Sequence, residues 1–231
     1  MRMWRSDSSK KMNSWAAKEH DAFERQRMIS EQLESRGIRE PRVLEAMRAT
    51  PRHLFVPEAL RRSAYQDRPL PIGYRATISQ PYMVAFMTEL LNPAAHHRLL
   101  EIGTGCGYQS AILAQLASHV YSMELIPELA RSAAERLREL GYLNVTVREG
   151  DGYQGWPEEA PFDGIVMTAA PREIPDTLIE ELAEGGRLVA PVGSHHCQRL
   201  IILDKHPGGR ISRWALEHVS FVPMIPAGIR S

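Results

Sequence analysis

The sequence has few cysteines, no excess charge of either sign and no long hydrophobic run. Among its 231 residues, Cys106 and Cys197 are the only cysteines, too few for a disulfide framework, and neither belongs to a CxxC pair. Sparse, unpaired cysteine is typical of a reducing compartment, so we expect a cytoplasmic protein. A membrane-spanning helix needs about 18 or more consecutive apolar residues. The sequence has no such run, so we expect no membrane partner.

Charge also excludes several classes of protein. The 28 Lys and Arg residues are balanced by 28 Asp and Glu residues, which gives a formal net charge of zero. Nucleic-acid-binding proteins usually carry a clear basic excess, so we expect no nucleic-acid partner. A hydrophobic content of 43% without net charge argues against a disordered chain. The length suits one domain with an added arm, and we expect a monomer.

The hydrophobic pattern predicts an α/β fold. Residues 1–20 are basic but have no continuous apolar segment, so we expect a flexible extension there and not a secretory signal. Residues 21–231 are expected to form one domain, with a helical and loop-rich arm at 21–80 and a core at 81–231. Strands are expected at 98–102, 119–124, 144–148, 163–169, 187–192, 200–203 and 214–224, and helices from 81 and at 107–118, 127–140 and 175–183. This alternation predicts a mostly parallel, Rossmann-like sheet with helices on both faces.

A glycine-rich loop follows the first of these core strands. Gly103, Gly105 and Gly107 form a GxGxG pattern, and Glu101 precedes it by two residues. A dinucleotide-binding loop would carry its third glycine one position later, where Tyr108 stands. The observed spacing resembles instead the first motif of the S-adenosylmethionine-dependent methyltransferases. Glycines at this place let the backbone turn sharply and approach a ligand closely.

Three acids lie at the ends of three successive strands. Glu101 can accept from the methionine ammonium of the cofactor, Glu124 from the ribose hydroxyls, and Asp151, beside Gly152, from the adenine amino group. The carboxyl ends of parallel strands share one edge of a sheet, so all three should face one crevice. The sequence therefore predicts a binding site for S-adenosylmethionine. The alternative is that these glycines serve only turns and the acids are solvated strand ends.

An ordered series of motifs resembles a known family, the protein-L-isoaspartate (D-aspartate) O-methyltransferases. The resemblance covers roughly residues 23–231, and the Thr77-Ile-Ser79 segment upstream of the glycine loop is its most specific part. The motifs that carry it are Leu70-Pro-Ile-Gly73, Ala76-Thr-Ile-Ser-Gln-Pro-Tyr-Met83, Leu100-Glu-Ile-Gly-Thr-Gly-Cys-Gly-Tyr-Gln109, Gly150-Asp-Gly152, Ala160-Pro-Phe-Asp163, Thr168-Ala-Ala-Pro171, Gly185-Gly-Arg-Leu188, Pro191-Val-Gly193 and Phe221-Val-Pro223.

The resemblance implies methyl transfer from S-adenosylmethionine to the free α-carboxylate of L-isoaspartyl and D-aspartyl residues. Such residues occur in damaged proteins and peptides, which are the expected partners. Formation of the methyl ester would initiate repair through a succinimide. The products would be the ester and S-adenosylhomocysteine. The resemblance places the serine that joins substrate and cofactor at Ser79, and the peptide cleft at Phe221, Val222 and Pro223. It implies cofactor contacts at Ala76, Thr77, Ile78, Ser79, Glu101, Gly103, Thr104, Gly105, Gly107, Glu124, Asp151 and Gly152.

Several alternatives stay open at this point. A small-molecule or RNA acceptor would keep the cofactor, and a non-catalytic S-adenosylmethionine-binding module would keep the pocket without turnover. The groups His96-His97 and His195-His196-Cys197 invite a zinc interpretation, but no second ligand pair with metal spacing lies nearby, so we expect no metal. Arg75 stands where the family usually has a smaller or less charged residue, and it could attract the substrate carboxylate.

Overall fold

The computed structural model describes residues 19–194 and 196–228 of the chain. The expected flexible extension therefore lies outside the described residues, except for residues 19 and 20, which are helical. A first helix runs through residues 19–28 and continues as a π-helical turn at Ile29–Leu33 and a 3-10 turn at Glu34–Arg36. Gly37 ends this segment in the left-handed conformation, with φ 98°.

The remainder of the arm is short helices and one hairpin. Helix α2 spans Pro41–Ala49, and two 3-10 helices follow at Arg52–Phe55 and Glu58–Ser63. Strands β1 (Leu70–Gly73) and β2 (Ala76–Ile78) then pair in an antiparallel hairpin. Helix α3 (Pro81–Leu91) begins where Pro81 predicts it, since proline is favoured in the first turn.

The described core contains a seven-stranded sheet in the order β5-β4-β3-β6-β7-β8-β9. Its strands are β3 (Arg98–Ile102), β4 (His119–Glu124), β5 (Val145–Glu149), β6 (Phe162–Met167), β7 (Leu182–Ser194), β8 (Cys197–Lys205) and β9 (Ile211–Val219). Strands β5, β4, β3, β6 and β7 run parallel to one another. Strand β8 pairs antiparallel with β7, and β9 pairs antiparallel with β8. The prediction of a mostly parallel sheet is confirmed.

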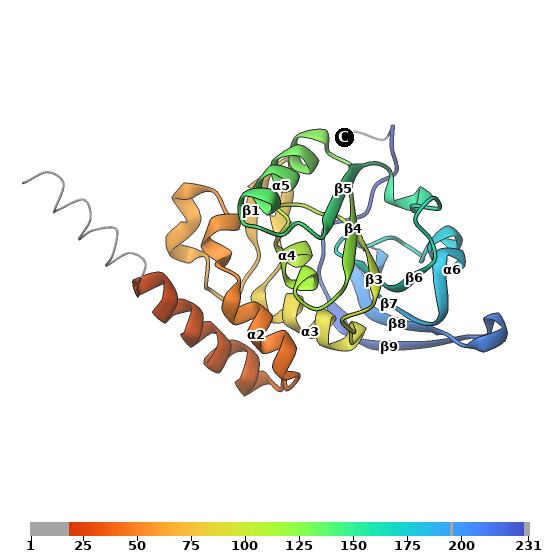
Figure 1. Cartoon of the computed structure of the whole chain (residues 1–231), viewed down its shortest axis with the longest axis horizontal. Coiled ribbons are helices and arrows are strands. Elements are labelled where there is room, and N and C mark those ends of the chain that lie inside the picture. The colour runs from red at the N-terminus through yellow and green to blue at the C-terminus, as the bar shows by residue number, and fades with distance from the viewer. Residues whose placement is uncertain (1–18, 195, 229–231) are drawn as a thin grey trace, which may run out of the picture.

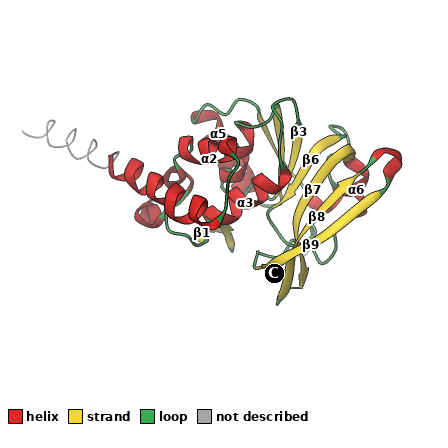
Figure 2. Ribbon diagram, turned by 90° about the horizontal axis from the view of Figure 1, so that it is seen from below, coloured by secondary structure: helices red, strands yellow, loops and turns green. Residues whose placement is uncertain are grey.

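Helices cover both faces of the sheet, as Figures 1 and 2 show. The helices are α4 (Tyr108–Ala114), α5 (Pro127–Glu139) and α6 (Asp176–Glu181). On one face Leu99 packs with apolar residues of α3 and α4. On the other face Leu100 packs with Leu178 of α6. Neighbouring residues of β3 therefore point to opposite layers, as the strand period of two requires.

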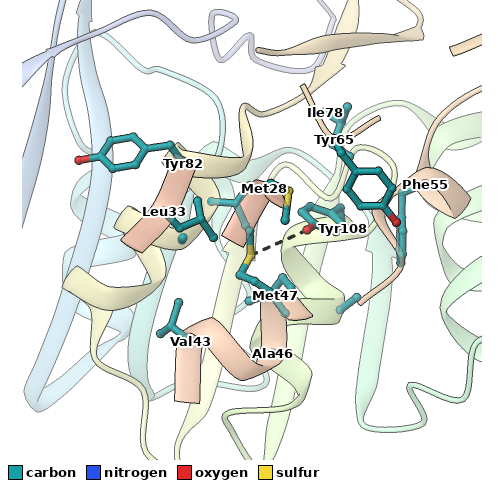
Figure 3. Packing of buried hydrophobic residues seen from close by; sticks show 14 of the residues in the cluster. Met28, Leu33, Val43, Ala46, Met47, Phe55, Tyr65, Ile78, Tyr82 and Tyr108 are labelled. Atoms are coloured by element: carbon teal, nitrogen blue, oxygen red, sulfur yellow. Dashed lines mark hydrogen bonds between the residues drawn. The ribbon is translucent and has the colours of Figure 1, made fainter. Parts of the chain in front are cut away.

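The arm is anchored to the core through a buried apolar cluster (Figure 3). Leu33 and Met47 are 0% exposed, and each such side chain contributes about 1.5–3 kcal/mol of stability on burial. The hydroxyl of Tyr108, the first residue of α4, donates to the sulfur of Met47 at 3.8 Å. The Phe55 ring meets the Tyr108 ring edge to face at 5.3 Å between centroids. Because Tyr108 follows Gly107 directly, the arm packs immediately beside the glycine loop.

Some expected element boundaries were wrong. A strand was predicted at 187–192, whereas β7 begins at Leu182 and includes Gly185 and Gly186, where the pairing with β6 shifts register. The last strand ends at Val219, and Phe221–Met224 runs on without strand partners except for a bridge between Pro223 and Ala170. The arm at 21–80 was predicted as helical and loop-rich, and the hairpin β1–β2 within it was missed.

Candidate active site

The glycine loop follows β3 and leads directly into α4. Gly103, Gly105 and Gly107 have φ values of 99°, 55° and 87°, a region that only glycine adopts readily. The Gly103 amide donates to the Met123 carbonyl at 2.8 Å, and the Gly107 amide donates to the Thr104 carbonyl at 2.8 Å. A Cβ atom on Gly103 would collide with the hydroxyl of Thr168. The glycines therefore let the backbone turn sharply, as predicted, and Gly103 packs closely against Thr168. Close approach to a ligand stays a prediction.

Glu124 ends β4 beside this loop. Its two carboxylate oxygens accept from the Gly105 amide at 2.8 Å and from the Ile126 amide at 3.0 Å. The residue is 7% exposed, and burial raises the pKa of its carboxyl in spite of these bonds. An ionised carboxylate can accept about four hydrogen bonds, so acceptor capacity remains for two ribose hydroxyls. Its position fits the predicted ribose contact.

Asp151 and Gly152 follow β5 on the neighbouring strand end. One oxygen of Asp151 accepts from the Tyr153 amide at 2.9 Å, and the other accepts from the Ala227 amide at 2.7 Å. A Cβ atom on Gly152 would collide with Ile102. The C-terminal segment therefore reaches the acid that is predicted to bind adenine. The order β5-β4-β3 brings the ends of all three acid-bearing strands to one edge.

Glu101 lies in a different environment from the other two acids. Its side chain is 0% exposed and accepts hydrogen bonds from the hydroxyls of Ser110, on α4, and Ser122, on β4, the latter at 2.7 Å. Thr104 shares a hydrogen bond of 2.6 Å with the same Ser122 hydroxyl. Burial raises the pKa of the Glu101 carboxyl to about 8. Strand alternation explains the burial of Glu101, because its side chain points to the same face of the sheet as Leu99, the face covered by α3 and α4.

One oxygen of Glu101 remains available to a donor. Its Oε1 is buried and has no hydrogen-bond partner among the residues that the structure describes. A buried acceptor without a partner costs free energy, and an ammonium group would satisfy it. The predicted contact with the methionine ammonium is therefore compatible with the chemistry of this atom, and it stays a prediction.

The hairpin β1–β2 lies against the glycine loop and leads to Ser79. A Cβ atom on Gly105 would meet the Cδ1 atom of Ile72, on β1, at 3.4 Å. Along β2, Ala76 is half-buried, Thr77 is exposed and Ile78 is 3% exposed. Ile78 belongs to the buried cluster of the arm, so its side chain supports the hairpin.

Ser79 lies in a small pocket between the hairpin, α3, the end of β6 and the segment after β9. Four predicted residues line this pocket together, namely Thr77, Ser79, Phe221 and Val222. Pro223 is not among its lining residues and pairs with Ala170. The sequence interpretation missed five lining residues: Pro69, Gln80, Met83, Thr168 and Ser220. Thr168 could have been found, because it lies near the C-terminal end of the predicted parallel strand 163–169, where ligand-binding residues concentrate.

Two other features of the sequence lie outside this pocket. The rings of His96 and His97 meet at 4.7 Å, and Nδ1 of His97 accepts from the Ala94 amide at 3.1 Å. His195 lies outside the described residues. Within residues 19–194 and 196–228, no group of three His, Cys, Asp or Glu side chains could hold a metal ion. In the same part of the chain, no helix is long and apolar enough to cross a membrane.

The sheet, the glycine loop and the strand-end acids together define a Rossmann-like, S-adenosylmethionine-dependent methyltransferase. The profile of the protein-L-isoaspartate(D-aspartate) O-methyltransferase family matches residues 24–227. The chain belongs to this family.

Similar proteins agree with this assignment. The chain is 54% identical to a protein-L-isoaspartate O-methyltransferase of Synechococcus sp. (strain JA-2-3B'a(2-13)), over 88% of this chain and 86% of the relative. It is 55% identical to that of Methanoculleus marisnigri, over 87% and 91%. A Plasmodium falciparum structure described as a protein-L-isoaspartate O-methyltransferase in complex with S-adenosyl-L-homocysteine has a TM-score of 0.75 and 26% identity, and the match covers 87% of this chain and 98% of that one. The activity of this chain is therefore that of a protein-L-isoaspartate O-methyltransferase.

Proposed function

We propose that the pocket around Ser79 receives the isoaspartyl residue and that Ser79 orients its free α-carboxylate toward the cofactor. The observation that carries this proposal is the meeting of Ser79 with Phe221 and Val222 in one pocket, next to Thr168, whose hydroxyl donates to the Gly103 carbonyl at 2.5 Å. Thr168 therefore lies between the glycine loop and the proposed peptide-binding residues Phe221 and Val222.

The residues at the sheet edge suit S-adenosylmethionine. Glu124 retains acceptor capacity for the ribose, Asp151 presents a carboxylate at the strand end proposed to receive adenine, and buried Oε1 of Glu101 has no donor among the described residues. Gly103 and Gly105 present bare backbone, which permits close approach. We infer that these groups hold the cofactor, with Thr104 and Gly107 shaping the loop. Ala76, Thr77 and Ile78 would support it from the hairpin.

When bound, S-adenosylmethionine supplies a methyl group already activated by a sulfonium. The substrate carboxylate has a reference pKa near 4 and is ionised at neutral pH, so no residue need remove a proton. The Ser79 hydroxyl can donate to this carboxylate and fix its direction. The apolar side chains of Met83, Phe221 and Val222 line the pocket and would limit water there. A site with little water favours a step in which a carboxylate and a sulfonium neutralise each other. No Ser/His/Asp triad is required.

A peptide pair tests the proposed function. The wild-type chain should transfer a tritiated methyl group to an isoaspartyl peptide and leave its normal aspartyl twin unlabelled. Ser79→Ala should lower kcat/KM roughly 10- to 100-fold, the loss expected for about 1.5–3 kcal/mol from a hydrogen bond to a charged acceptor. Its Kd for S-adenosylhomocysteine should stay within a few-fold of wild type. Ser132→Ala, on the exposed side of α5, serves as the matched control.

The outcomes separate the candidate functions. Equal labelling of both peptides, or methylation of a small carboxylic acid or an RNA instead, would reject the isoaspartyl proposal. S-adenosylhomocysteine binding without any labelling would indicate a non-catalytic module. Wild-type turnover in Ser79→Ala would remove the role assigned to that hydroxyl.

We also infer the setting in which the enzyme acts. Damaged proteins and peptides are its proposed partners, without nucleic acid, and we propose a cytoplasmic monomer in which arm 21–80 and core 81–231 form one domain. The buried contacts of Met47 and Phe55 with Tyr108 support the single domain. Light scattering coupled to gel filtration tests the monomer, and a single cooperative unfolding transition tests the domain.

A further inference from the structure

Thr168 stands between the glycine loop and the pocket of Ser79. It directly follows β6, and its amide donates to the Ile102 carbonyl at 2.9 Å. Its hydroxyl lies 2.5 Å from the Gly103 carbonyl and 3.1 Å from that of Ile102. The same residue lines the pocket together with Ser79 and Phe221. Thr168 thus contacts both halves of the site.

The chemistry of threonine suits this position. The Cβ atom of threonine carries a hydroxyl and a methyl group that point in different directions, and branching at Cβ restricts χ1. With the hydroxyl held by the loop carbonyls, the methyl is the group left for the pocket. The Gly103 carbonyl is fixed where the backbone has φ 99° and where no Cβ atom would fit beside Thr168. Loop position and pocket shape therefore depend on one rotamer.

We propose that Thr168 is a positioning residue with two separable roles. Its hydroxyl holds Gly103 in the conformation that binds the cofactor, and its methyl group forms part of the wall against which the isoaspartyl peptide packs. The second role rests on the proposed function of the pocket, whereas the first depends only on cofactor binding.

Two conservative variants separate the roles in the full chain. Thr168→Val keeps the shape and removes the hydroxyl, so the Kd for S-adenosylhomocysteine, measured by calorimetry, should rise roughly fivefold, as expected for one neutral hydrogen bond. Its KM for an isoaspartyl peptide at saturating S-adenosylmethionine should stay within twofold. Thr168→Ser keeps the hydroxyl and removes the methyl, so its Kd should stay within twofold while the peptide KM rises roughly fourfold, the size expected for one buried methyl group.

A control variant and the melting temperature distinguish these effects from general damage. Thr146→Val removes an exposed threonine hydroxyl on β5 that bonds His119 at 2.8 Å, outside the site, and should change neither constant. If both Thr168 variants changed Kd and KM in equal proportion, following their melting temperatures, the role would be merely structural and the proposal overturned.

Each role can also fail separately. A wild-type Kd in Thr168→Val would overturn the loop role, and a wild-type KM in Thr168→Ser would overturn the pocket role. A wild-type chain that methylates no isoaspartyl peptide would overturn the proposed function and the pocket role with it. The loop role would still be decided by the Kd of Thr168→Val.

Discussion

Buried Glu101 should make the stability of this protein fall as pH rises. The carboxyl has an ordinary pKa of 4.5, which burial raises to about 8 in the folded chain. Between these values the unfolded group is ionised while the folded group keeps its proton. The folded state therefore binds one more proton, and the free energy of unfolding decreases with pH in this window.

The size of the effect follows from the shift. One bound proton changes the free energy of unfolding by about 1.4 kcal/mol per pH unit. From pH 6 to pH 8 the expected loss is about 2 to 3 kcal/mol, since the folded group begins to titrate near the upper end. Glu101→Gln keeps the shape and removes the titration, so its stability should not carry this slope.

Urea denaturation followed by circular dichroism, at half-unit steps from pH 6 to pH 8, measures the difference between the two proteins. Subtracting the variant from the wild type removes the contribution of other titrating groups, including His53, His97 and His119, whose pKa values burial lowers. Glu139→Gln, on the exposed end of α5, should keep the wild-type slope. A wild-type minus Glu101→Gln difference that is constant with pH would refute this account of Glu101.

Cofactor binding should also change the protonation of the Glu101 carboxyl. If the methionine ammonium pairs with Glu101, it favours the ionised form, and binding of S-adenosylhomocysteine at pH 7 should release a proton. Calorimetry in two buffers of different ionisation enthalpy counts that proton. If the binding enthalpy of the wild type were the same in both buffers, as expected for Glu101→Gln, the ammonium would not pair with Glu101.

Three further substitutions test the site and the hairpin. Gly103→Ala should abolish detectable S-adenosylhomocysteine binding in calorimetry, because its Cβ atom would collide with Thr168; a wild-type Kd would contradict this. Asp151→Asn should weaken that Kd roughly tenfold, since one oxygen must replace two acceptors that bond the Tyr153 and Ala227 amides; an unchanged Kd would remove the adenine role. Tyr74→Asn should raise the free energy of unfolding by up to about 1 kcal/mol, because Tyr74 is exposed with φ 51° and Asn tolerates that conformation better; a lower urea midpoint would contradict this.

Local patterns were sufficient to predict the parallel half of the sheet. Strands 98–102 and 119–124 were predicted with the bounds of β3 and β4, since a short apolar run bounded by turns is a local signal. Hairpin β1–β2 was missed because its turn residues, Tyr74 and Arg75, give no Asn-Gly signal. They nevertheless adopt φ values of 51° and 59°.

The sequence by itself determined the family, the parallel sheet and the acids at its strand ends, because glycine spacing and strand-end positions are local features that topology brings to one edge. Only the tertiary structure decided what each acid contacts. Glu101 and Glu124 both end predicted strands, but α4 covers the first, whereas the loop amides bind the second. The pocket was also a tertiary result, because Ser79, Thr168 and Phe221 come from distant segments that meet only in the fold.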